Sequence, residues 1–193
     1  MNRMIPLLLF LGFLPGAALA ENTSVYTPFD LKTCTQVQKP DEYVFEGAWK
    51  CKGIEGYEIF QSGVDARSYA AFGKKDSGTH CAALKTFSPF NTALSPIEWR
   101  LKDGKPIAAI ERWSVTDADG IRTTWLVVNA LRENESCQAH YVAGSYPNAN
   151  EAARRAADSF AEKFDCETGI PTFDSEIGVP PIELNACKDL ARE

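Results

Sequence analysis

The stretch PIEWRLKDGKPIAAIERWS, residues 96–114, places a Lys-Asp-Gly-Lys turn at 102–105 between two runs rich in apolar and aromatic residues. An Asp-Gly pair between such runs is a strong hairpin signal. Two further turns follow, at Asp117–Gly120 and at Arg132–Glu135. The spacing therefore predicts an antiparallel meander of four strands, at residues 97–102, 105–116, 121–131 and 136–143.

The positions of these turns fix which residues lie opposite each other on neighbouring strands. The predicted register pairs Trp99 with Ala108, Arg112 with Trp125, and Val127 with His140. Both faces of the resulting sheet carry too many apolar side chains to lie against water. We therefore expect another layer of the fold to cover each face.

The run NANEAARRAADSFAEKF, residues 148–164, predicts the main helix. Asn148 is suited to cap the helix, and one stripe of small and aromatic residues would face the sheet. Arg154 is spaced for an ion pair with Asp158, and Arg155 for one with Glu151, on the exposed side. The alanines of the stripe allow the helix to lie close to the strands.

The N-terminal half predicts a hairpin, with strands at 43–51 and 57–61 joined by a turn at Gly53–Gly56. Residues 65–73 are compatible with a third strand, 21–42 have the composition of a polar arm, and 74–95 give no clear pattern. The predicted fold class is α+β: an antiparallel β-meander with an N-terminal hairpin and one main C-terminal helix packed on it, stapled by disulfides.

Residues 1–20 have the layout of a secretory signal peptide, with Arg3, an apolar run and Ala18-Leu19-Ala20 before the expected cleavage site. Removing them leaves a single domain at 21–193, whose proline-rich tail is 168–193. The net charge changes from −6 to −7, because Arg3 is the only charged residue removed. An acidic chain without clustered cations is not expected to bind nucleic acid.

Six cysteines in an exported chain predict a disulfide framework. A strand followed by a helix of similar length returns the chain to its starting point, which pairs Cys137 with Cys166. The arm before the first hairpin pairs Cys34 with Cys51. Cys81 and Cys187 remain, and their bond would tether the tail to the middle of the chain.

Several stretches together resemble an uncharacterised family of small exported proteins of Gram-negative bacteria. They are Cys34, WKCKGxxGY at 49–57, IEWRL at 97–101, IxRW at 110–113, NANEAARRAAD at 148–158 and FDC at 164–166. The resemblance implies a periplasmic setting, carries no active-site residues over to this chain, and implies that Asn22 and Asn134 of the two N-x-S/T sequons are not glycosylated.

The candidate binding surface consists of Arg112, Trp125 and His140, because the predicted register places a guanidinium over an indole on one face. Glu98 and Glu111 fall on the helix-covered face, where paired carboxylates could hydrolyse a glycan. No metal or cofactor is expected, since the two histidines and six cysteines lack the spacing of a zinc site.

These residues favour a monomeric periplasmic or secreted protein that works as a binding or inhibitory module, with a protein partner in the envelope. The alternatives are a hydrolase of envelope polymers acting through Glu98 and Glu111, and a purely structural or stress protein. No stable membrane insertion is expected after cleavage, because the apolar run is shorter than a bilayer requires.

Overall fold

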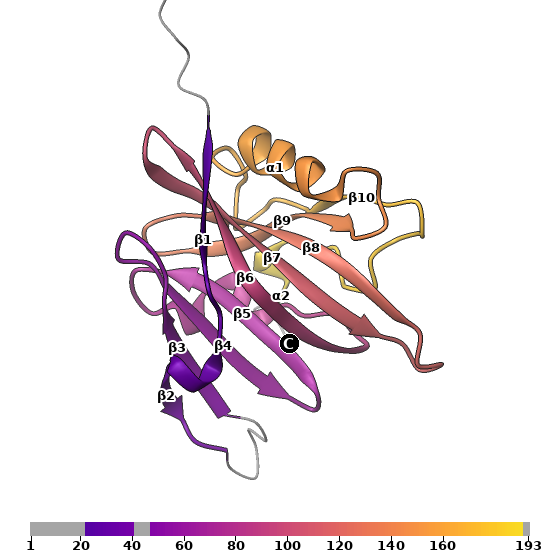
Figure 1. The fold of residues 1–193 in the computed structure, drawn as a ribbon, viewed down its shortest axis with the longest axis horizontal. Helices are drawn as coiled ribbons and strands as arrows, with labels where there is room; N and C mark the ends of the chain where they lie inside the picture. Colours follow the sequence, from indigo (N-terminus) through magenta and orange to yellow (C-terminus); the bar gives the residue numbers. More distant parts are fainter. Residues whose placement is uncertain (1–21, 41–46, 191–193) are drawn as a thin grey trace, which may run out of the picture.

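The fold is α+β, with two β-sheets stacked face to face and one main helix on the outer face of the larger sheet (Figure 1). The computed structural model describes residues 22–40 and 47–190. The predicted signal peptide and the start of the first predicted hairpin strand, residues 43–46, lie outside these residues. Among the described residues, no helix is long and apolar enough to cross a bilayer.

The larger sheet has the order β1-β6-β7-β8-β9-β10. Its strands are β1 (Thr23–Thr27), β6 (Phe90–Lys102), β7 (Lys105–Thr116), β8 (Arg122–Leu131), β9 (Ser136–Ala143) and β10 (Thr172–Asp174). The predicted four-strand meander is confirmed as β6 to β9, although β6 begins seven residues earlier than expected. The edge strands β1 and β10 were not predicted, since each is short and pairs with a partner remote in sequence.

The smaller sheet has the order β2-β3-β4-β5. Its strands are β2 (Thr35–Gln38), β3 (Gly47–Lys52), β4 (Glu58–Val64) and β5 (Arg67–Gly73). The described part of the predicted N-terminal hairpin forms β3 and β4, and the third predicted strand forms β5. The predicted polar arm is wrong for Thr23–Thr27 and Thr35–Gln38, which are strands. Three short 3-10 helices, η1 (Leu31–Thr33), η2 (Ser77–Thr79) and η3 (Cys81–Leu84), complete this half.

The register of the central meander differs by one residue from the predicted register along most of its length. In the first hairpin Lys102 lies opposite Lys105, as predicted, but an irregularity between Arg100 and Leu101 then places Trp99 opposite Ala109. The third hairpin likewise shifts between Val128 and Asn129, so that Val128 lies opposite His140. Bulges of this kind insert one residue into one strand, and they leave no signature in the hydrophobic pattern.

The second hairpin is shifted because its loop is one residue longer than predicted. The Asp117 amide donates to Ile121 O, which leaves three residues in the loop, and Gly120 has a φ of 79°. A three-residue loop that ends in a left-handed glycine is a common alternative to the two-residue loop. As a result, Trp113 lies opposite Trp125 and Arg112 lies opposite Leu126.

Both faces of the meander are covered, as predicted. Helix α1 (Ala149–Phe160) lays four buried alanines on the outer face, against Ile110, Leu126 and Val128. The inner face packs on the smaller sheet, with the aromatic rings of Phe72, Phe87, Trp99, Trp113 and Trp125 between them. The helix ends at Phe160, four residues before the predicted end, and Asn148 precedes it in a left-handed conformation without a side-chain cap.

Charged side chains also attach α1 to β6. Arg154 Nε donates to Glu98 Oε1 at 2.6 Å, and Arg100 makes two bonds to Asp158, of 3.0 and 2.7 Å. Glu98 and Arg100 are both about 7% exposed, whereas the side chains of Arg154 and Asp158 are 31% and 30% exposed, so each ion pair is shielded from solvent on one side only. The predicted pairing of Arg154 with Asp158 is therefore wrong, because each side chain turns toward the sheet.

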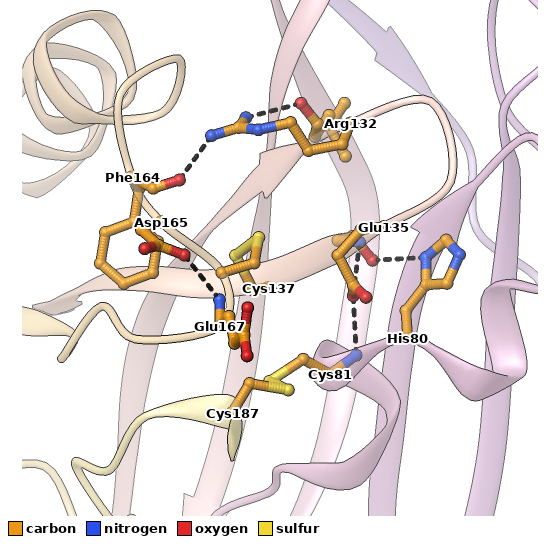
Figure 2. The surroundings of a disulfide bond; sticks show 12 residues. His80, Cys81, Arg132, Glu135, Cys137, Phe164, Asp165, Glu167 and Cys187 are labelled. Atoms are coloured by element: carbon orange, nitrogen blue, oxygen red, sulfur yellow. Dashed lines mark hydrogen bonds between the residues drawn. A yellow bond between two sulfur atoms is a disulfide. The ribbon is translucent and has the colours of Figure 1, made fainter.

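All three predicted disulfides are confirmed: Cys34–Cys51, Cys81–Cys187 and Cys137–Cys166. Figure 2 shows the second, which joins η3 to the terminal helix α2 (Cys187–Leu190). Around it, Glu135 accepts a bond from the Cys81 amide at 2.8 Å, and Arg132 donates to Phe164 O at 2.6 Å. The cross-links and these polar contacts hold the chain after α1 against the start of β9.

Loop length sets the expected contribution of each disulfide to the free energy of unfolding. Replacing Cys81 and Cys187, 106 residues apart, by alanine should cost roughly 5 kcal/mol. Replacing Cys34 and Cys51, 17 residues apart, should cost roughly 3 kcal/mol. Urea unfolding of the two double variants without reductant measures both values. A larger loss for the Cys34/Cys51 variant would contradict the dependence on loop length.

Candidate functional site

The candidate site is a groove between helix α1 and the edge strand β10, with His140 of β9 on its floor. Strand β10 runs parallel to β9, and a parallel neighbour needs a crossover connection, which α1 supplies. The Cys137–Cys166 bond returns the chain to the start of β9, so that residues after Cys166 can run along β9 in the same direction. Because α1 lies over β7, β8 and β9, it leaves a gap above His140 beside β10.

The groove has two lobes that meet at Ser159, Phe160 and Thr172. The polar lobe, of about 380 Å³, contains His140, Arg155 and Asp174. The apolar lobe, of about 280 Å³, is lined by Ala139, Phe160, Phe164, Ile170 and Lys163. A ligand with an apolar group and a polar or charged group could use the side chains of both lobes.

His140 is 4% exposed and lies between two side chains of β10. Its Nδ1 atom is 2.7 Å from Thr172 Oγ1, and its Nε2 atom is 3.4 Å from Asp174 Oδ2. The second contact is too long for a good hydrogen bond and is mainly electrostatic. Burial lowers the pKa of His140, an effect that the carboxylate of Asp174 opposes in part. The imidazole is therefore neutral at neutral pH.

Two cations without an ion-pair partner border the groove. Arg155 and Lys163 are exposed, and none of the ion pairs among the described residues involves either of them. The adjacent Arg154 differs, since Glu98 neutralises it on the other side of the helix. These two cations place positive charge on the helix side of the groove, opposite the carboxylate of Asp174 on β10.

The predicted binding surface of Arg112, Trp125 and His140 is not assembled. Arg112 points to the outer face, where its Nη2 donates to Asn150 Oδ1 of α1 at 2.8 Å. Trp125 is 2% exposed and packs between the two sheets. The predicted pairing of Arg112 with Trp125 is wrong because of the longer second loop, and only His140 of the three borders the groove.

Glu98 and Glu111 lie on opposite faces of the sheet, so the prediction that they share a face is also wrong. Glu98 faces α1, where Ser24 and Arg154 donate to it. Glu111 is 1% exposed on the inner face, where it accepts a 2.8 Å bond from Trp113 Nε1. Burial raises the pKa of Glu111 to about 8, although the Trp113 bond acts in the other direction. The two carboxylates cannot flank one glycosidic bond.

Thr172, Asp174 and Phe160 were not predicted as site residues. The alternation of Thr172, Phe173 and Asp174 after Pro171 is a short strand pattern, which the proline-rich character of the tail obscured. His80, the second histidine, is buried elsewhere, with Nδ1 3.2 Å from Ser136 Oγ. No group of three potential metal ligands occurs within residues 22–40 and 47–190.

Comparison with known proteins finds no matching family model, no similar curated protein and no similar solved structure.

The new register predicts that Arg112 and Trp125 contribute to stability independently. Trp125→Ala should cost about 3–5 kcal/mol because it empties a buried site. Arg112→Ala should cost less than about 1 kcal/mol, since its bond to Asn150 is exposed. In a double-mutant cycle the coupling energy should stay within about 0.5 kcal/mol. A larger coupling energy would indicate that Arg112 and Trp125 are in contact as a cation–π pair, contrary to the observed register.

The buried Glu111 predicts a pH-dependent stability. Its folded-state pKa lies above its ordinary value of 4.5, so the folded protein retains a proton that the unfolded chain releases. Stability should fall between about pH 4.5 and about pH 8, by at most about 1.4 kcal/mol per pH unit. Glu111→Gln should remove this slope in urea titrations, whereas the exposed Glu176→Gln control should keep it. An unchanged slope in Glu111→Gln would refute the assignment.

Proposed function

We propose that this protein is an exported binding module of the bacterial envelope that holds an extended segment of a protein partner in the groove between α1 and β10. The observation that carries the proposal is the groove itself, in which a lobe that contains charged side chains adjoins a more apolar lobe on a disulfide-linked scaffold. Where the bound segment borders an active site of the partner, binding would also inhibit that partner.

The position of β10 favours an extended peptide as the ligand. β10 is the last strand of the larger sheet, so one side of its backbone has no neighbouring strand in that sheet. An extended peptide can add to such an edge through main-chain hydrogen bonds, and alternate side chains then enter pockets on one face. Thr172 and Asp174 point toward the groove from this strand, so alternate residues of an added peptide would do the same.

The charge and surface of the groove favour a segment that contains both acidic and apolar residues. Arg155 and Lys163 supply positive charge at the rim, and Phe160 is 45% exposed between the lobes. Ile170 is 63% exposed at the far wall. An apolar side chain would bury against Phe160 and Ile170, while a neighbouring carboxylate would lie near Arg155.

The compartment is part of the same proposal. Three disulfides pair all six cysteines, which is typical of proteins that fold in an oxidising environment. The signal-peptide pattern of residues 1–20 and the resemblance to small exported proteins favour the periplasm or the exterior. We propose that the mature protein acts there as a monomer.

An array of synthetic peptides of about ten residues, with acidic and apolar residues in varied order, tests the function. The oxidised protein should bind peptides that contain both residue types. Phe160→Ala and Arg155→Glu should each weaken binding by about tenfold or more. The exposed residues Phe90 and Arg122 provide matched controls, since Phe90→Ala and Arg122→Glu alter surfaces outside the groove.

Fluorescence anisotropy with the tightest peptide then gives the dissociation constant for each variant. Equal binding by the groove variants and the controls would refute the groove as the binding site. If no peptide binds, the proposed function fails, and the alternative of a purely structural or stress protein gains support.

A further inference from the structure

Thr172, His140 and Asp174 form a row that resembles a nucleophile, a base and an orienting carboxylate. The Thr172 hydroxyl is 2.7 Å from His140 Nδ1, and the opposite ring nitrogen is 3.4 Å from Asp174 Oδ2. Thr172 and Asp174 are two residues apart on β10, so both side chains point to the same face, toward His140. A hydroxyl bonded to an imidazole whose other ring nitrogen faces a carboxylate resembles a catalytic triad, although the 3.4 Å contact is longer than the hydrogen bond of a formed triad.

The surroundings favour a neutral imidazole at His140. The charged groups that line this lobe with His140 are Arg155 of α1 and Asp174 of β10. The negative Asp174 favours the tautomer in which Nε2 carries the ring proton, and Nδ1 is then free to accept the Thr172 hydrogen. Since burial lowers the pKa of His140, the imidazole is available as a base at neutral pH.

Thr172 also occupies the position that an acyl-transfer reaction requires. It is exposed and lines both lobes of the groove. An apolar acyl chain would fit in the lobe of about 280 Å³ formed with Phe160, Phe164 and Ile170. The leaving group would then lie in the polar lobe with Arg155 and Ser159, so the ester carbonyl would lie next to the Thr172 hydroxyl.

We propose that Thr172 is a nucleophile that cleaves carboxylic esters with a short apolar acyl group, with His140 as the base and Asp174 as its orienting partner. This activity uses the same groove as the proposed binding function but does not require a peptide ligand. The protein would then be an esterase that acts through Thr172, His140 and Asp174. It would not be the glycan hydrolase that the sequence suggested, which was expected to act through Glu98 and Glu111.

The reaction proceeds in two balanced steps. Thr172 Oγ1 forms a bond to the carbonyl carbon as its proton moves to His140 Nδ1, and the carbonyl oxygen takes up the negative charge in the lobe that also contains Arg155. The ester C–O bond then breaks, and His140 gives the proton to the departing alkoxide. Water next attacks the acyl-threonine, passes a proton to His140, and releases the carboxylic acid as the proton returns to Thr172.

The test uses p-nitrophenyl butanoate and the oxidised protein. The release of p-nitrophenol should show an initial burst close to one equivalent of protein, and mass spectrometry after acid quenching should find one butanoyl group on Thr172. Thr172→Val should abolish the adduct and Thr172→Ser should retain it. His140→Asn should slow acylation by about 100-fold or more. The exposed Thr92→Val is the matched control and should react like the parent.

The pH profile separates catalysis from a structural role of the same contacts. Acylation should rise with pH as His140 loses its proton, with a midpoint below the ordinary value of 6.5. Thermal unfolding of each variant identifies any loss of activity that arises from unfolding, and Thr172→Ser provides the conservative rescue. An adduct on another residue, or no adduct on the folded parent, would overturn the proposal. Peptide binding in that case would leave the proposed function intact.

Discussion

The four central strands, β6 to β9, are apolar on both faces, and this requirement for cover on two sides organises the rest of the molecule. The inner face is closed by the smaller sheet, which brings the large aromatic rings into one layer. The outer face is closed by α1, whose alanines allow the helix axis to approach the strands. Helix α1 packs mainly on β7, β8 and β9, and the groove lies where β10 extends the sheet beside the helix.

The elements that could be predicted from the sequence are those specified by local chemistry. Asp103-Gly104 adopts left-handed conformations, with φ of 50° and 75°, and closes the first hairpin where expected. The Cys137–Cys166 pair followed from the lengths of a strand and a helix, Cys34–Cys51 from the arm before the first hairpin, and Cys81–Cys187 from the two cysteines that remained; all three bonds are present. The sequence also predicted that both faces of the meander are covered by other parts of the fold, because apolar side chains lie on both sides of each strand.

The candidate site could not be predicted from the sequence, because it depends on single-residue details. One extra residue in the loop after Asp117 separates Arg112 from Trp125 by the thickness of the sheet. The bulge near Asn129 places both Ala139 and His140 on the outer side, since both border the groove. The partners of His140 come from β10, whose three residues pair with a strand about thirty positions earlier in the chain, which no local pattern can specify.

The Cys137–Cys166 bond has a consequence for recognition as well as for folding. It converts β9, α1 and their connection into a covalently closed ring, from which the chain enters β10 within six residues. Both walls and the floor of the groove are thus anchored to the same ring, so their spacing is set before any molecule arrives. A ligand that binds then loses translational and rotational entropy, but the protein itself loses little conformational entropy. This small entropic cost allows even a shallow groove to bind its ligand with measurable affinity.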